Sequence, residues 1–135
     1  MAEVSIFTIG DYADIQNGNL YGMGIGWNWC YEAVPPLTLI ARVLVAPSRL
    51  EAGNVSWVFS LIDSDGRAQA FPDDGKWSAV PSPTTSDGAF PGADVPLWIL
   101  HRLPGFTLSP DRYQWRLDVD GATAAYPFTV VSPRP

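Results

Sequence analysis

The stretch Tyr113-Gln-Trp-Arg-Leu-Asp-Val-Asp-Gly121 decides the fold of this chain. Large apolar side chains alternate with polar ones through it, at Tyr113, Trp115, Leu117 and Val119. A period of two predicts a β-strand with one buried face and one face in water. The Asp120-Gly121 pair then predicts a tight turn, because glycine adopts the positive φ angles that two-residue hairpin turns require. We therefore expect residues 122–131 to return antiparallel to this strand.

Similar short segments, each closed by turn residues, occupy most of the remaining chain. Strands are expected at residues 4–9, 20–31, 37–45, 55–62, 67–71 and 95–102. Asn17-Gly18 and Asp63-Ser-Asp-Gly66 have the composition of hairpin turns, and Pro127 predicts a sheet edge or a bulge in the last strand. No long segment has helical periodicity. The pattern predicts an all-β fold: a single antiparallel β-sandwich, Ig-like or a flattened barrel, of seven or eight strands.

Composition and charge exclude several classes of function. The chain has 135 residues, which suits one domain with a real core. Its formal net charge is −6 and Lys76 is its only lysine, so no nucleic-acid partner is expected. A single cysteine, Cys30, the lack of a signal-peptide pattern and the lack of a long apolar window predict a soluble cytoplasmic protein with no membrane partner.

The motifs that could carry chemistry do not meet its requirements. Gly22-Met-Gly-Ile-Gly26 resembles a dinucleotide fingerprint, but the residues after it predict a continuing strand and not the helix that would receive a pyrophosphate. Asp63-Ser-Asp-Gly66 opens like a calcium loop, but the glycine and glutamate expected later in such a loop are absent. His101 has no nucleophile motif to serve and is expected to be structural. We expect no catalytic residue, no cofactor, no metal, and hence no enzyme.

Three aromatic residues suggest one alternative. Alternation along the predicted strand at residues 20–31 places Trp27, Trp29 and Tyr31 on one face. A row of rings can stack against a sugar, which would make the chain a carbohydrate-binding or small-ligand-binding module. In a chain with 6 tryptophans, core or interface packing is the stronger interpretation of the same row.

Residues 72–94 are expected to form one long loop. Prolines at 72, 81, 83 and 91 stiffen it, and Trp77 and Phe90 provide apolar anchors that a loop in water does not need. Two hypotheses follow. The loop is an ordered arm that docks to a partner, or it folds back over its own sheet and covers residues such as Trp98.

Several strands are apolar on both faces, and this favours docking. A two-layer sandwich buries only one face of each sheet, so the second apolar set requires a cover from the long loop or from a partner. The candidate partner-binding residues are Ile40, Leu44, Trp98 and Leu100 on the strands, with Trp77 and Phe90 on the loop. The leading hypothesis is a non-enzymatic structural protein that docks to copies of itself, as a homo-oligomer, or to a larger assembly.

Two blocks of sequence resemble a family of uncharacterised small bacterial and phage-encoded proteins, a domain of unknown function. They are Gly10-Asp-Tyr-Ala13 with Asn17-Gly-Asn-Leu-Tyr-Gly22, and Phe106-Thr-Leu with Tyr113-Gln-Trp-Arg-Leu-Asp-Val-Asp-Gly121. The resemblance implies a β-sandwich and supplies no catalytic residues. It also suggests the kind of assembly: a phage virion, in which the chain would be a capsid-decoration, head or tail accessory.

Overall fold

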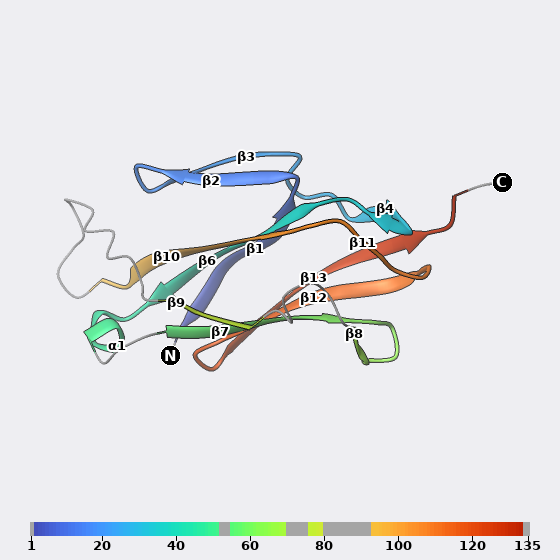
Figure 1. The fold of residues 1–135 in the computed structure, drawn as a ribbon. Coiled ribbons are helices and arrows are strands. Elements are labelled where there is room, and N and C mark those ends of the chain that lie inside the picture. The colour runs from blue at the N-terminus through green and yellow to red at the C-terminus, as the bar shows by residue number, and fades with distance from the viewer. Residues whose placement is uncertain (1, 52–54, 70–75, 80–92, 134–135) are drawn as a thin grey trace.

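The computed structural model describes residues 2–51, 55–69, 76–79 and 93–133, and it is all-β, as the sequence predicts (Figure 1). The strands are β1 Glu3–Gly10, β2 Tyr12–Gln16, β3 Asn19–Met23, β4 Trp29–Tyr31, β5 Ala33–Val34, β6 Leu37–Val45, β7 Val55–Ile62, β8 Ala68–Gln69, β9 Lys76–Ala79, β10 Val95–Leu103, β11 Phe106–Thr107, β12 Asp111–Val119 and β13 Ala122–Val131. In the described part of the chain one helix of five residues, α1 Pro47–Glu51, follows β6.

Two sheets pack face to face. The order of the first is β1-β6-β10, and the order of the second is β4-β13-β12-β7-β8, with β9 also paired to β7. Every pair in these sheets is antiparallel except β4 with β13. The long strands β1, β6 and β10 form one layer and β7, β12 and β13 the other, and Figure 1 shows the two layers. A sheet of the first, second and fourth long strands that faces the third, fifth and sixth matches strands A, B and E facing C, F and G of an Ig-like sandwich, which the sequence left open beside a flattened barrel.

The stretch that decides the fold forms β12 and the start of the β12–β13 hairpin. Trp115 and Leu117 are fully buried between the sheets, and Arg116 on the opposite face pairs with Asp118 at 3.2 Å. Asp120 and Gly121 have φ angles of 43° and 84°, as a two-residue turn of the predicted kind requires. The predicted faces and turn are confirmed.

Tyr113 fixes the crossover that leads from one sheet to the other. Its hydroxyl donates to the backbone carbonyl of Ser109 at 2.7 Å, four residues upstream. A tyrosine at the start of a strand that bonds back in this way is a hallmark of Ig-like sandwiches. Burial, with the carboxylates of Asp111 and Asp63, raises the pKa of Tyr113, so the hydroxyl remains a donor at neutral pH.

Pro127 lies at a position of β13 where the strand ladder does not require a backbone N–H donor. It pairs with Gln114 of β12 on one side, while β4 joins β13 only from Thr129 to Val131. Within the described residues Pro127 therefore lies on an edge segment of β13, as predicted.

The predicted strand at residues 20–31 is wrong. β3 ends at Met23, the chain turns through Gly24 and Gly26, whose φ angles are 61° and 91°, and β4 begins only at Trp29 in the other sheet. A Cβ atom on Gly24 would clash with the carboxylate of Asp11, so this turn requires glycine. The glycines that looked like one face of a strand instead redirect the chain.

The predicted loop at residues 72–94 contains a short strand in the part that the structure describes. Lys76–Ala79 forms β9, whose backbone pairs with residues 55–58 of β7, so Trp77 is opposite Trp57 in register. The rest of the predicted loop up to residue 92, including Phe90, lies outside the described residues. This short part thus pairs with β7, whereas Trp98, which the fold-back hypothesis expected the loop to cover, lies on β10 of the other sheet.

We expect Trp115→Ala to lower the free energy of unfolding by about 3–5 kcal/mol, because it leaves a large cavity between the sheets. The ring is fully buried and stacks on Phe128 with centroids 6.1 Å apart. Gln114→Ala, one residue away on the opposite face, is the matched control and should be nearly silent. Denaturant melts measure both, and equal midpoints would contradict the assignment of the faces.

We expect Gly18→Val to destabilise the fold by more than about 1 kcal/mol. Gly18 has a φ angle of 77° and no atoms within 4 Å of a built Cβ, so the cost comes from backbone strain alone. Gly18→Asn should cost less, because asparagine tolerates left-handed backbone angles. Thermal melts that rank the two variants in the reverse order would rule out strain as the cause.

Candidate functional site

A β-hairpin covers part of the outer face of the β1-β6-β10 sheet. The chain leaves β1 at Gly10, and β2 and β3 form a separate two-stranded layer above the sheet (Figure 1). β2 lies against β6 and β10. Ile40, on the outer face of β6, is 0% exposed, and Ala13 on the underside of the hairpin is 4% exposed. The chain's own first hairpin thus covers the part of the second apolar face around Ile40.

This cover corrects the candidate partner-binding residues. Ile40 is completely buried, so it is not available to a partner. Leu44, Trp98 and Leu100 lie on the same outer face, and each is half-buried. Nothing can be said of the Trp77 side chain, and Phe90 lies outside the described residues. Of the four candidate residues whose side chains the structure describes, Ile40 is therefore buried and the other three are partly exposed.

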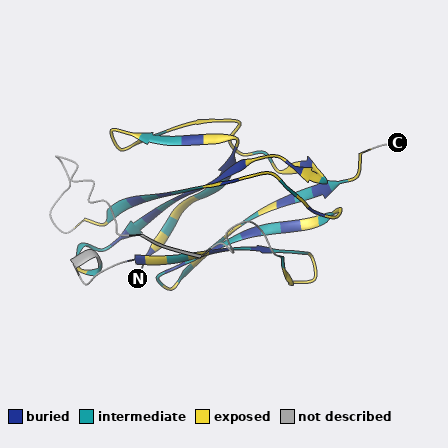
Figure 2. Ribbon diagram, in the orientation of Figure 1, coloured by how far each residue is buried: buried dark blue, intermediate teal, exposed yellow. Residues whose placement is uncertain are grey.

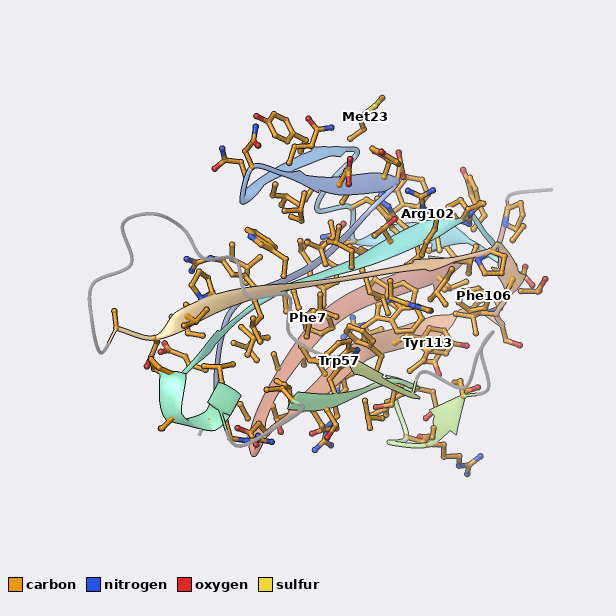
Figure 3. All side chains as sticks on the ribbon, turned by 60° about the vertical axis from the view of Figure 1, so that its left-hand side comes forward. Phe7, Met23, Trp57, Arg102, Phe106 and Tyr113 are labelled. Atoms are coloured by element: carbon orange, nitrogen blue, oxygen red, sulfur yellow. The ribbon has the colours of Figure 1, made fainter. Side chains whose placement is uncertain are left out.

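Several contacts hold the hairpin in place. The backbone N–H of Gly26 donates to the carbonyl of Ile9 at 2.8 Å, which ties the turn after β3 to β1. The guanidinium of Arg102 lies 4.9 Å from the ring centroid of Tyr12, a cation–π contact between β10 and β2. Figure 3 shows Arg102 on the side of the sheet that faces the hairpin. Ile25 packs over Gly10 and Gly22, where a Cβ atom would collide with it.

The exposed apolar residues of the molecule are concentrated on this hairpin and on β4. Of the large hydrophobic residues that are exposed in the described part of the chain, only Ile6 and Val58 lie elsewhere. The others have exposed fractions between 42% and 69% and define what we call the hairpin surface: Tyr12, Tyr21, Met23, Ile25, Trp29 and Tyr31. Figure 2 shows the hairpin and β4 largely exposed, and Met23 points away from the body of the molecule in Figure 3.

The three aromatic residues of the alternative interpretation do not share one face. Trp27 precedes β4, packs edge-on against Phe128 at 6.3 Å, and its carbonyl accepts the hydroxyl of Tyr126 at 2.9 Å. Trp29 and Tyr31 do lie on one face of β4, but their planes meet at 89°. The prediction of a row of three was wrong because the strand begins two residues after Trp27. Only Trp29 and Tyr31 project into solvent.

The polar and reactive groups elsewhere are engaged in structure. His101 packs against Phe59 in the interior, with ring centroids 6.5 Å apart. The Asp63 carboxylate accepts hydrogen bonds from the backbone N–H groups of Asp65 and Arg67 and from the amide of Gln69. Aspartate commonly stabilises hairpin turns in this way. Burial raises the pKa of the Cys30 thiol beneath β4, so it is protonated at neutral pH and a poor nucleophile.

Two shallow depressions, of about 270 and 480 Å³, lie on the β4-β13-β12-β7-β8 sheet, away from the hairpin surface. Trp57 and Asp118 line the first, and Arg112 and Asp63 line the second. In the second, the Ser64 hydroxyl donates to Asp111 at 2.9 Å and, with the Arg112 backbone N–H, lowers the pKa of that carboxyl. Among the described residues no three histidine, cysteine or acidic side chains are grouped as a metal site would require.

We expect Ala13→Asp to loosen the hairpin, because it buries a charge against β6. The variant should bind more of the dye ANS than the wild type and unfold at lower denaturant. Gln16→Asp adds the same charge at an exposed position of the same strand and should behave like the wild type. Equal dye binding by the two variants would contradict the hairpin as the cover of Ile40.

Comparison with known proteins adds no relatives. No protein-family model, no curated protein and no solved structure matches this chain. The resemblance to small bacterial and phage-encoded proteins therefore stays a prediction. The helix in the described part of the chain is far too short to cross a bilayer. What the chain does must be argued from its own geometry, and in that geometry the hairpin surface is the strongest candidate for a functional site.

Proposed function

We propose that this chain is a non-enzymatic assembly module that docks, through the hairpin surface, to copies of itself or to a larger protein assembly. One observation carries the proposal. The exposed apolar side chains gather on the hairpin and on β4, while the described remainder of the surface has only Ile6 and Val58 of comparable size and exposure. Apolar side chains that gather on one part of a surface are typical of protein interaction sites.

The charge of the segment supports the same function. Between Tyr12 and Tyr31 the only charged residue is Asp14, in a chain whose formal net charge is −6. The centres of protein interfaces are depleted of charge and enriched in tyrosine, tryptophan and methionine, because those side chains release much water without the cost of desolvating an ion. The hairpin surface has both properties.

The shape of the segment favours a protein partner over a small ligand. The two depressions described above lie at β7, β12 and β13, and neither has a residue of the hairpin surface in its wall. Trp29 and Tyr31 meet edge to face, so they do not offer the flat platform on which a sugar ring stacks. A phage particle is the larger assembly that the sequence resemblance suggests, and the proposal does not depend on it.

We expect the wild-type chain to show a weight-average mass that rises with concentration in sedimentation equilibrium. Trp29→Glu should lower this self-association by about tenfold or more, because it places a charge in an interface. Trp29 is 53% exposed and lies outside the hydrophobic core, so the variant should still fold.

Val58→Glu is the matched control. Val58 is 38% exposed on β7, which β13 and β12 separate from the β4 strand that bears Trp29, so the new charge lies outside the hairpin surface and should leave the mass unchanged. Equal loss in both variants would show that charge alone, and not the position of the surface, controls association. A wild type that stays monomeric throughout would exclude self-docking.

A further inference from the structure

The outer edge of β3 is an open row of backbone hydrogen-bonding groups. Within the described residues β3 pairs only with β2. Four of its five residues are exposed. An unpaired strand edge presents N–H and C=O groups in the spacing that another strand matches. Such an edge is therefore suited to pair with an extended backbone segment.

The register of the hairpin identifies the outward groups. Asn17 and Gly18, with φ angles of 52° and 77°, form the turn, so the flanking residues Gln16 and Asn19 are a hydrogen-bonded pair. Hydrogen-bonded and non-bonded pairs alternate along an antiparallel ladder. The backbone groups of Tyr21 therefore point toward β2, while those of Leu20 and Gly22 point outward.

β3 lacks the devices that protect other strand edges in this molecule. A bulge lies between Val4 and Ile6 of β1, Pro96 lies in β10, and Pro127 lies on the edge segment of β13. Bulges, prolines and lysines are the usual means of preventing edge-to-edge pairing. The sequence of β3, Asn19-Leu-Tyr-Gly-Met23, contains no proline and no charge, and its pairing with β2 has no register shift.

We propose that β3 pairs antiparallel with β3 of a second copy, about a two-fold axis at Tyr21, to join two hairpins into one four-stranded sheet. This inference rests on the proposed function and names its self-docking geometry. Leu20 of one copy then exchanges both backbone hydrogen bonds with Gly22 of the other. The two-fold axis produces an identical exchange between Gly22 of the first copy and Leu20 of the second. Tyr21 faces its own equivalent as a non-bonded pair, whose Cα atoms are about 4.5 Å apart in such ladders.

Charge and symmetry favour a second copy as the occupant. The five paired residues are neutral, so the pairing brings no like charges together despite the net charge of −6. The nearest acidic side chain is Asp14, opposite Tyr21 on β2. Two such residues would be separated by three strand spacings, roughly 14 Å, which exceeds the screening length of about 8–10 Å at moderate salt. Cross-strand contact between the two Tyr21 rings adds to the backbone pairing.

The pairing can be trapped with a cysteine at position 21. In a Cys30→Ala background, which removes the single native cysteine, Tyr21→Cys should form a disulfide dimer under mild oxidation, because the paired Cα atoms lie within the range that a disulfide spans. The rate is read from non-reducing gels, with purified chain as the only protein present.

Met23→Cys is the matched control. Met23 is 69% exposed against 53% for Tyr21, so a thiol there is the more accessible one. In the proposed register Met23 faces Asn19 of the other copy, and two cysteines at position 23 would lie about 13 Å apart, beyond disulfide reach. We expect Tyr21→Cys to crosslink roughly tenfold faster than Met23→Cys, and a mixture of Asn19→Cys with Met23→Cys to yield the mixed dimer.

The outcomes separate the edge geometry from the proposed function. If the wild type self-associates but Tyr21→Cys crosslinks no faster than Met23→Cys, the β3 pairing is wrong and self-docking survives through another part of the hairpin surface. If the wild type is monomeric and neither cysteine crosslinks, self-docking is wrong as well, and the open edge is left to a strand of a different protein. Faster crosslinking at position 21, with the mixed dimer, supports the pairing.

Discussion

β6 is buried on both of its faces, and the arrangement of the other strands follows from this. Its inward residues, such as Leu39 and Val43, lie between the two sheets, and Ile40 on the opposite face is equally inaccessible to water. A sandwich of two layers covers only one face of each sheet. The chain meets the requirement with a third, partial layer made from its own residues 12–23. Fully burying an isoleucine is worth about 1.5–3 kcal/mol, which opposes detachment of that layer.

The hairpin that forms the third layer itself exposes apolar side chains to solvent. The hairpin covers Ile40 with the underside of its strands, where Ala13 is buried. Because side chains alternate along a strand, its other face must then point to solvent, and there the chain has Tyr12, Tyr21 and Met23, with Asp14 as the one charged residue. A cover needed only for the core would have a wholly polar outer face. The exposed apolar residues on this face are the ones on which the proposed docking function rests.

The sequence predicts local features well and relations between distant segments poorly. Alternation along residues 113–119 and the Asp120-Gly121 pair indicated the strand, its buried face and the turn correctly, because each depends on neighbours in the chain. The identity of the cover over Ile40 could not be predicted, since the hairpin reaches it only by a change of direction at Gly10 and Gly24. The glycines at 22, 24 and 26 have a strand-like spacing, and positive φ angles at two of them end the strand. Exposure of Tyr21 and Met23 depends on that same change of direction.

The distribution of hydrogen bonds separates the hairpin surface from the rest of the molecule. Asp63 and Tyr113 satisfy backbone groups at turns and crossovers, and Arg116 pairs with Asp118 beside it, so these polar side chains already have partners within the fold. On β3, in contrast, the outward backbone N–H and C=O groups of Leu20 and Gly22 have no strand partner in the described structure. Within the described structure β3 thus combines an unpaired edge of five uncharged residues with the exposed apolar side chains of Tyr21 and Met23, and these are the two features that strand-to-strand association requires.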